Sequence, residues 1–238
     1  MAIGKDVSTL LEAIGYNFSD LSRLDNALTH SSYANESKIR RLNYPSNERL
    51  EFLGDAVLEI LITEFLYENF KNYAEGMLTK MRQHLVCEKT LSKIALSIDL
   101  GDYLHLGRGE EANECRRRPK VLADAFEALV AAIYLDSGKF SVPHSKECIL
   151  TLFSDEIELC INSHRGDYKT LLQQLVEKDG SAMLEYVVVD ENGPDHNKSF
   201  TVEARVNNNT VGLGVAGNKK DAEMQAAMHA LRLFGVTV

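Results

Sequence analysis

Carboxylates in otherwise apolar helical segments are the residues whose type and spacing could do chemistry here. Asp124 and Glu127 are the only charged residues in the stretch Val121–Leu135, and being three positions apart they share one helix face. A helix that is apolar almost all round is buried, and an ionised carboxylate inside it is costly unless it is paired or bound to a metal ion. Taken alone, the pair fits either a metal site or a structural pair that forms salt bridges or lies at an exposed edge.

The segment Asn47–Leu58 carries a second group of acids. At roughly 100° per residue, Glu48, Glu51 and Asp55 fall within about 60° of one another on a helical wheel. Glu59 falls on the same face, so the spacing alone does not decide which acids matter. Like charges on one stripe repel one another, a divalent cation would relieve that repulsion, and oxygen-only donors suit Mg²⁺ better than zinc. The alternative is a solvated acidic helix face.

Three segments give the sequence a recognisable pattern. Asn47–Leu58 resembles, essentially residue for residue, the N-E-R-L-E-F-L-G-D-[AS]-V-L signature of the ribonuclease III family. Val121–Asp136 is similar to the family's second acidic helix and Ala27–Asn35 to its N-terminal motif. The resemblance covers nearly the whole chain. It implies hydrolysis of double-stranded RNA with Mg²⁺, giving 5′-phosphate and 3′-hydroxyl ends, with precursors of ribosomal RNA and structured messenger RNAs as the expected substrates.

The resemblance also implies roles for individual residues. The metal and catalytic carboxylates would be Glu51, Asp55, Asp124 and Glu127, with Asp55 and Glu127 as the catalytic pair. Glu48 would lie near the dimer interface and the substrate, Phe52 would insert into the partner subunit of a homodimer, and Glu75 would be an auxiliary metal ligand. All four core carboxylates are present. Their presence favours an enzyme over the alternative, a module that only binds or remodels double-stranded RNA.

The elements that must position these residues are mainly helices. Residues 1–162 are predicted to form an all-helical nuclease domain, because apolar residues recur at three- and four-residue spacing. The segments with this spacing are Ser8–Ile14, Leu21–Thr29, Asn47–Asn69, Leu78–Ile98, Val121–Leu135 and Lys146–Ile161. Asn47 is predicted to be an N-cap. The polar residues 163–166 are predicted to form a linker.

Residues 167–236 show a pattern that is typical of a small α+β module, so the fold class is mostly α with this module added. A predicted helix, Tyr168–Lys178, precedes three strands, and a final helix covers Lys219–Phe234. The strands are predicted near Leu184–Asp190, Ser199–Asn207 and Thr210–Ala216. Both helices are expected on one face of an antiparallel sheet. This order, and three of its motifs, resemble the double-stranded-RNA-binding domain.

The RNA-binding residues that this second resemblance implies are Thr170, Gln173, His196, Lys219 and Lys220. A helix that begins with two lysines is a phosphate site, because its N–H groups, its dipole and both cations favour an anion. Gln173 and His196 would reach 2′-hydroxyls and base edges in minor grooves. A lysine pair alone is equally compatible with a solvated helix end, and Arg116–Arg118 with Lys120 fit either further phosphate contacts or a disordered basic loop.

Composition sets limits on these interpretations. The formal charge of the 238 residues is −9, which argues against a nucleic-acid partner, so any RNA surface must be a local patch. No apolar run is long enough to span a membrane and the N-terminus does not resemble a signal peptide. The four cysteines are scattered, without a C-x-x-C pair, which favours free thiols in a reducing cytoplasm over zinc or disulfides.

Overall fold

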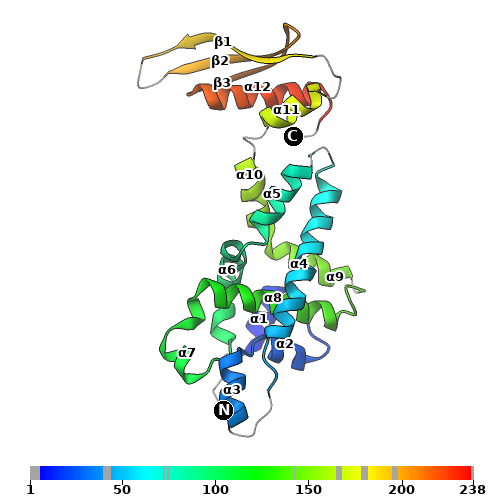
Figure 1. Ribbon diagram of the computed structural model, residues 1–238, viewed down its shortest axis with the longest axis vertical. Helices are drawn as coiled ribbons and strands as arrows, with labels where there is room; N and C mark the ends of the chain where they lie inside the picture. The colour runs from blue at the N-terminus through cyan, green and yellow to red at the C-terminus, as the bar shows by residue number, and fades with distance from the viewer. Residues whose placement is uncertain are drawn as a thin grey trace. The chain divides into compact units, whose positions relative to one another are not determined.

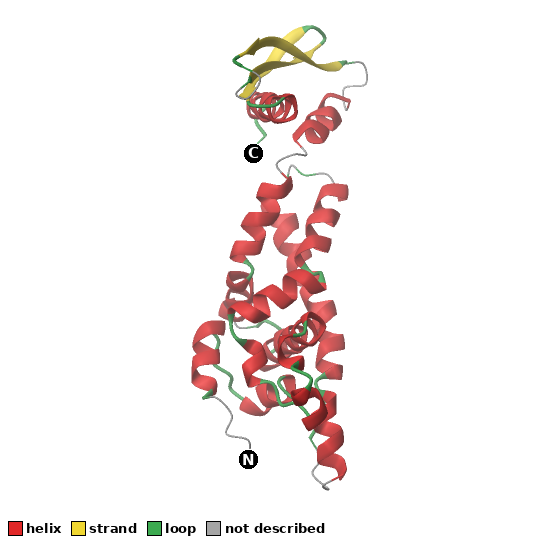
Figure 2. Cartoon of the chain, turned by 90° about the vertical axis from the view of Figure 1, so that its left-hand side faces the viewer, coloured by secondary structure: helices red, strands yellow, loops and turns green. Residues whose placement is uncertain are grey.

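In the computed structural model the chain forms two compact units, Met1–Asn69 with Thr79–Glu158 and Phe70–Leu78 with Leu159–Val238 (Figure 1). The structure describes residues 6–39, 44–71, 73, 75–141, 143–164, 168–177, 182–194 and 198–236. Within these ranges the first unit is built from helices and all three strands belong to the second (Figure 2). No helix in the described part of the chain is long and apolar enough to cross a membrane.

Where the structure describes it, the part of the chain before the second module is mainly helical. The bounds of its helices are α1 Val7–Ile14, α2 Leu21–Ala27, α3 Ser31–Ile39, α4 Glu48–Asn69, α5 Glu75–Leu85, α6 Glu88–Ser97, α7 Arg108–Ala112, α8 Pro119–Asp136, α9 Pro143–Leu152 and α10 Ser154–His164. Two short 3₁₀ turns, Leu100–Tyr103 and Cys115–Arg117, lie between α6 and α8. The division between the two units falls within α5 and within α10.

Helix α8 is the central element of the first unit. It packs against α2, α4 and α6, and its apolar residues are buried on almost every side, as the sequence predicted for this segment. The cluster around Ala27, Ala128 and Ala132 shows why the contacts are close, because small side chains let the backbones of α2 and α8 approach. A helix packed in this way has fixed side-chain directions, so any polar residue on it is held in one place.

Two predicted helices are in fact pairs of helices. Leu78–Ile98 divides into α5 and α6 at Val86 and Cys87, and Lys146–Ile161 divides into α9 and α10 at Phe153. The apolar spacing continues through both breaks because buried residues lie on either side of each, Leu85 and Leu91 at the first and Ile149 and Ile157 at the second, where Phe153 is buried as well. Hydrophobic periodicity therefore reports which residues are inside, and it does not report whether the backbone hydrogen bonds continue.

Helices α3 and α7 were not predicted, because α3 has little amphipathic pattern and α7 has no buried residue. Long-range hydrogen bonds join them: the Gly107 N–H donates to Ser32 Oγ at 2.9 Å, and the Arg108 N–H donates to Glu36 Oε1 at 2.6 Å.

Ser163 and His164, predicted as linker, belong to the last turn of α10. Terminal helical turns need no apolar face, so periodicity misplaces them. The domain bounds themselves stay a prediction.

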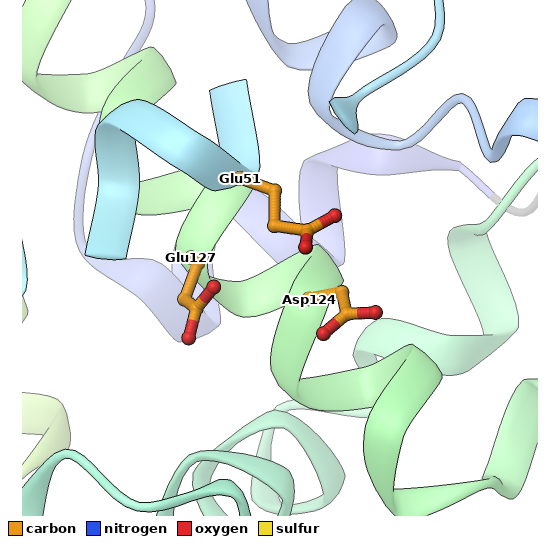
Figure 3. A group of neighbouring side chains, drawn as sticks. All are labelled: Glu51, Asp124 and Glu127. Carbon is orange, nitrogen blue, oxygen red and sulfur yellow. The ribbon is translucent and has the colours of Figure 1, made fainter. Parts of the chain in front are cut away.

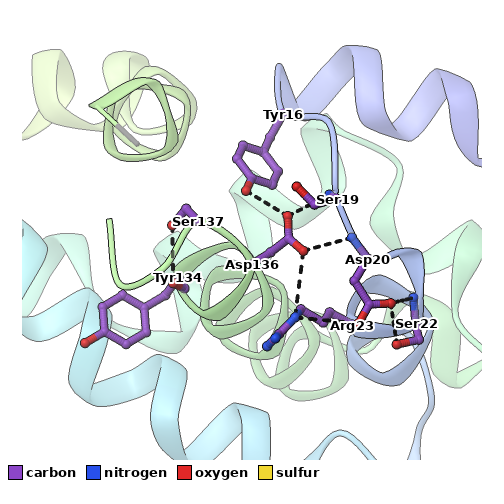
Figure 4. A network of polar contacts seen from close by, with 8 residues as sticks. All are labelled: Tyr16, Ser19, Asp20, Ser22, Arg23, Tyr134, Asp136 and Ser137. Atoms are coloured by element: carbon purple, nitrogen blue, oxygen red, sulfur yellow. Dashed lines mark hydrogen bonds and ion pairs between the residues drawn. The ribbon is translucent and has the colours of Figure 1, made fainter. Parts of the chain in front are cut away.

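The carboxylate of Asp136, at the end of α8, organises the start of α2 (Figure 4). It accepts hydrogen bonds from the Tyr16 hydroxyl at 2.9 Å and from the N–H groups of Ser19 and Asp20 at 2.8 and 3.0 Å, and Arg23 Nε lies 3.7 Å away. Its side chain is almost completely buried. These partners satisfy the buried charge, so Asp136 fixes the N-terminal segment to α8.

The module of the second unit has the predicted order: helix α11 Tyr168–Glu177, strands β1 Leu184–Asn192, β2 Ser199–Val206 and β3 Asn209–Ala216, and helix α12 Lys219–Leu233. The strands form an antiparallel sheet in the order β1-β2-β3. Asn207 and Asn208 both have positive φ values, 49° and 65°, which is the backbone that a two-residue hairpin turn requires.

Helices α11 and α12 cover one face of this sheet, as expected (Figure 1). Alternate residues of β2, Val202 and Ala204, point into the core between sheet and helices. On β3 the inward positions are Gly212 and Gly214, where a Cβ atom would lie 2.0 Å from a carbonyl oxygen of α12. Only glycine therefore allows α12 to lie this close to the sheet.

Candidate active site

Three carboxylates come together where α4 and α8 cross. Glu51 is in the first turn of α4, and Asp124 and Glu127 lie three residues apart on α8. Ligand atoms of the three side chains lie within 4.8 Å of one another, and all three side chains are half-buried (Figure 3). The structure thus brings Glu51, from the first acidic group that the sequence singled out, together with both acids of the second group.

Gly54 is what permits this approach. A Cβ atom at position 54 would lie 1.9 Å from the carbonyl oxygen of Glu127, so the two helix backbones are in direct contact there. Glu51 precedes Gly54 by three residues and therefore emerges beside Glu127 and Asp124. Sequence reasoning assigned no role to Gly54. The available signal was a glycine inside a helix, which costs roughly 0.5–1 kcal/mol relative to alanine and is kept only for a reason such as close packing.

The cluster is electrostatically strained. Burial raises the pKa of Glu127 from its ordinary 4.5 to about 7, and the charges of Asp55, Asp124 and Glu51 add to the effect, while Lys120 opposes it. Burial also raises the pKa of Glu51, and the Asp124 carboxylate is the next largest cause. Both shifts have the sign expected when like charges are forced together in a poorly solvated place. An additional cation would be favoured there.

Asp55, predicted as a catalytic residue, lies one turn beyond Glu51 on α4 and is exposed. Asp55 is not a member of the group of three. Among the neighbouring charges, however, it has the largest effect in raising the pKa of Glu127. Glu59, which shares this helical face, forms an ion pair with Arg82 at 3.2 Å. The structure thus separates Glu59, which has a structural partner, from the acids that face α8.

The remaining predicted residues of the nuclease domain lie on α4 and α5. Glu48 is exposed in the first turn of α4 and accepts a hydrogen bond from Ser46 Oγ at 3.0 Å. Phe52 is 83% exposed, which is unusual for a phenylalanine on an ordered helix. Glu75 is the first residue of α5 and lies in the second unit. The roles assigned to these three residues stay predictions.

Asn47 directly precedes α4, where an N-cap was predicted, and its hydrogen bonds run to the end of α2. Its N–H donates to the Thr29 carbonyl at 2.8 Å, and its side-chain amide donates to the Ala27 carbonyl at 3.3 Å. The residue is buried. It therefore fixes the start of α4, and with it the place of Glu51, against the helix that packs on α8.

The donor set suits a hard divalent cation. Glu51, Asp124 and Glu127 offer only oxygen atoms, and the group that the described residues form contains no histidine or thiol. The mutual repulsion of these half-buried carboxylates would be relieved by a bound cation. The residues present therefore fit Mg²⁺, in agreement with the sequence-based expectation of the ligand chemistry.

Lys120 lies beside this group, one turn before Asp124 on α8. Its Nζ donates to Asp124 Oδ1 at 3.1 Å, and its side chain is 71% exposed. The neighbouring basic run differs in kind, because the Arg116 guanidinium donates to the carbonyls of Gly101 and Leu104 at 2.9 and 2.7 Å and to both oxygens of Glu111. Arg116 is therefore a structural residue, and the alternative of a disordered basic loop is wrong for it.

In the second module Lys219 and Lys220 are exposed in the first turn of α12. Asn218 caps that helix by accepting from the Asp221 N–H at 2.9 Å. Lys219 Nζ lies 5.3 Å from the centre of the Phe200 ring and 3.9 Å from Glu191. Two cations in a first turn oppose the helix dipole, so they weaken the helix and favour a bound anion.

Thr170 and Gln173, the other described residues predicted to contact RNA, are both exposed on α11. Gln173 Nε2 donates to Glu177 Oε1 at 2.6 Å, one turn further along the helix. His196 lies outside the described residues. The contacts of these three residues with RNA stay predictions.

Comparison with known proteins gives the same two parts. The sequence model of the family described as Ribonuclease-III-like matches residues 20–153, and that of the Double-stranded RNA binding motif matches residues 168–233. Ribonuclease 3 of Caldanaerobacter subterraneus subsp. tengcongensis is 44% identical over 229 residues, which is 95% of this chain and 97% of that protein. Ribonuclease 3 of Geobacillus kaustophilus is 46% identical over 222 residues, 93% of this chain and 88% of that protein.

A solved structure agrees with these sequence relatives. The nuclease domain of ribonuclease III from Campylobacter jejuni, described as flexible in a region involved in dimer formation, is similar with a TM-score of 0.56 and 39% identity. The match covers 63% of this chain and 97% of the solved one. With two acidic helices crossing at a glycine, a double-stranded-RNA-binding motif after them, and relatives that match over almost their whole length, the chain belongs to the ribonuclease III family of endoribonucleases that act on double-stranded RNA.

Proposed function

We propose that Glu51, Asp124 and Glu127, with Asp55 beside them, hold Mg²⁺ and that the protein uses this site to hydrolyse phosphodiester bonds of double-stranded RNA. The observation that carries the proposal is the convergence of three half-buried carboxylates within 4.8 Å, one of them with its pKa raised to about 7. A structural ion pair would not need three acids in one place. An ion-binding site does.

The chain's own residues supply binding and orientation. Gly54 holds α4 and α8 together, so the carboxylates are already assembled before any ligand arrives. With a pKa of about 7, the Glu127 carboxyl group is only partly ionised near neutral pH, and a bound cation would favour its ionised form. Bound Mg²⁺ would lower the pKa of water and stabilise the negative charge that develops on the phosphate and the leaving 3′ oxygen. Products would then carry 5′-phosphate and 3′-hydroxyl ends.

Substrate binding would rest on the second module and on a homodimer. Lys219 and Lys220 at the start of α12 would contact phosphates, while Thr170, Gln173 and His196 would contact the minor grooves. A two-fold dimer suits a duplex, because its two antiparallel strands are related by local two-fold axes. The exposed ring of Phe52 supports such an interface, since burial in a partner would remove it from water.

The expected substrates and cellular site follow from the same proposal. We expect precursors of ribosomal RNA and structured messenger RNAs as substrates. All four cysteines are free thiols, three of them buried, which is compatible with the reducing cytoplasm.

The decisive experiment is a cleavage assay on a simple RNA duplex with Mg²⁺, with Ca²⁺, or with a chelator, for the wild type and Glu127→Gln. We expect cleavage only by the wild type and only with Mg²⁺. The affinity of Glu127→Gln for the duplex should lie within a few-fold of the wild-type affinity. Ca²⁺ should support binding without hydrolysis, because its larger and more flexible shell does not enforce octahedral geometry. Glu68→Gln, an exposed position near the other end of α4, is the matched control and should cleave normally. If Glu127→Gln cleaved at the wild-type rate, or lost duplex binding as completely as cleavage, the assignment would be wrong.

A further inference from the structure

Lys120 lies at a position of α8 where a positive charge is unfavourable for the helix. It follows Pro119, the first residue of α8, so its positive charge lies at the positive end of the helix dipole. Its ion pair with Asp124 has the lysine on the N-terminal side, which is the weaker order for an i, i+4 pair. With 71% of its side chain exposed, the pair adds little to the stability of the fold. Helix stability therefore does not explain a lysine at position 120.

The acidic site does explain it. The Nζ of Lys120 lies 3.1 Å from Asp124 Oδ1, and its charge also acts on Glu51 and Glu127. Lys120 is thus the cation that partly balances these carboxylates while the site holds no metal. A divalent cation that binds Asp124 would compete with Lys120 for the same carboxylate oxygens, and the ammonium group would have to leave.

A released Lys120 would face an anionic ligand. The duplex carries a phosphate at every nucleotide, and the acids that would hold the metal repel those phosphates. The lysine side chain is a flexible four-carbon stem with a compact charge, and most of it is already in solvent. It can therefore move from the carboxylate to a phosphate oxygen without any change in the backbone of α8.

We propose that Lys120 is a substrate-binding residue of the catalytic site, which pairs with Asp124 in the free protein and with a phosphate of the RNA strand next to the scissile bond once the carboxylates hold their cation. The inference rests on the proposed function for the location of that bond. The exchange of partners prevents the acidic site from repelling its own substrate.

The test compares Lys120→Gln and Lys120→Arg with Lys139→Gln. Lys139 is exposed just beyond the opposite end of α8, and the helix rises roughly 24 Å from Lys120 to that end at 1.5 Å per residue. Its substitution makes the same change of charge. Single-turnover cleavage with Mg²⁺ should fall about 100-fold in Lys120→Gln, at the lower end of the range found when one transition-state donor is removed. Lys120→Arg should recover most of the rate, and Lys139→Gln should match the wild type.

Two further measurements do not depend on cleavage. With Ca²⁺, which should allow binding without hydrolysis, Lys120→Gln should reduce the salt dependence of duplex binding by about one phosphate contact relative to the wild type. Mg²⁺ titrated into the RNA-free protein should bind Lys120→Gln as tightly as the wild type or more tightly, because a competing cation is gone. A lysine that only orients Asp124 would give the opposite result, with weaker Mg²⁺ binding and a rate that recovers at high Mg²⁺.

These measurements distinguish a failure of the inference from a failure of the proposed function. A normal rate in Lys120→Gln, or a defect that high Mg²⁺ cures, overturns the inference and leaves the proposed function intact. If the wild type failed to cleave with Mg²⁺, the proposed function would fail, and the salt dependence of binding would still report whether Lys120 touches phosphate. An unchanged salt dependence of Lys120→Gln with Ca²⁺ overturns the inference in either case.

Discussion

Replacing Glu127 by glutamine should make the metal-free protein more stable while it abolishes cleavage. Burial and neighbouring acids raise the pKa of Glu127 from 4.5 to about 7. At about 1.4 kcal/mol per tenfold change in an ionisation constant, ionising this side chain costs the fold about 3 kcal/mol. The side chain is partly exposed and Lys120 is nearby, so the net gain from removing the charge should be about 2 kcal/mol above neutral pH.

The pH dependence gives the sign of this effect. The pKa of the Glu127 carboxyl is higher in the folded than in the unfolded protein, so the native state holds the extra proton between about pH 4.5 and pH 7. Its destabilising effect is absent below about pH 4.5, grows through this window and is complete above pH 7. The stability advantage of Glu127→Gln over the wild type should grow over the same window and be absent at pH 4.5.

The measurement is thermal unfolding of the wild type and Glu127→Gln in a chelator at pH 5 and pH 8, with Glu68→Gln as the control for losing one exposed acid. An advantage of about 2 kcal/mol corresponds to about 4–8 °C in Tm for a unit of this size. Added Mg²⁺ should raise the Tm of the wild type more than that of the variant, because mass action stabilises only a protein that binds the ion. A variant that is no more stable than the wild type at pH 8, or equally stabilised by Mg²⁺, would refute this reasoning.

Three other substitutions test the rest of the site. Gly54→Ala should cost about 2–3 kcal/mol of stability, in the range for overpacked contacts, and should lower the cleavage rate, because its Cβ would lie 1.9 Å from the Glu127 carbonyl oxygen. Replacing Lys219 and Lys220 by alanine should weaken binding to every duplex and reduce the salt slope by about one to two, with sequence preference unchanged. Phe52→Ala should shift the protein toward monomer in sedimentation experiments. A mixed dimer with one Glu127→Gln subunit should nick a single strand, where wild-type dimers leave double-strand breaks.

A control variant and the contradicting results distinguish these predictions from a general loss of folding. Gly109→Ala also places a Cβ on a helix, but it would meet nothing within 4 Å, and it should be neutral or slightly stabilising. Equal effects at positions 54 and 109 would mean that the contact of α4 with α8 does not govern the site. An unchanged salt slope would mean that Lys219 and Lys220 do not touch phosphate, and double-strand cleavage by a monomer in one encounter would exclude the dimer.

The sequence predicted the acidic helices better than it predicted the elements around them. The buried character of α8 follows from its unbroken apolar content, and two acids within it were visible without any structure. The α-β-β-β-α order of the second module was also predictable, because its turns are marked by glycine and asparagine. The two broken helices and the polar helices α3 and α7 were not, since their limits depend on tertiary hydrogen bonds such as that from Arg108 to Glu36.

For the site, helical spacing could place acids on a face but could not tell which face met another. Glu59 and Glu51 share a stripe, yet Glu59 pairs with Arg82 while Glu51 meets Asp124. The difference comes from the crossing of α4 and α8 at Gly54, a contact between residues more than 70 positions apart. Periodicity contains no information on such contacts. The role of Lys120 depends on the same long-range arrangement.

The hydrogen bonds of Asp136 also impose an order on biosynthesis. Its partners Tyr16, Ser19 and Asp20 are 116–120 residues earlier in the chain. At about 5–20 residues per second, the ribosome adds the intervening stretch in roughly 6–24 s, and during that time the N-terminal segment has no partner for these groups. In the module at residues 168–236 the strands pair with their neighbours in sequence, so these contacts can form without a comparable delay. The nuclease domain therefore spends the longer time exposed to aggregation or to chaperones while the protein is being made.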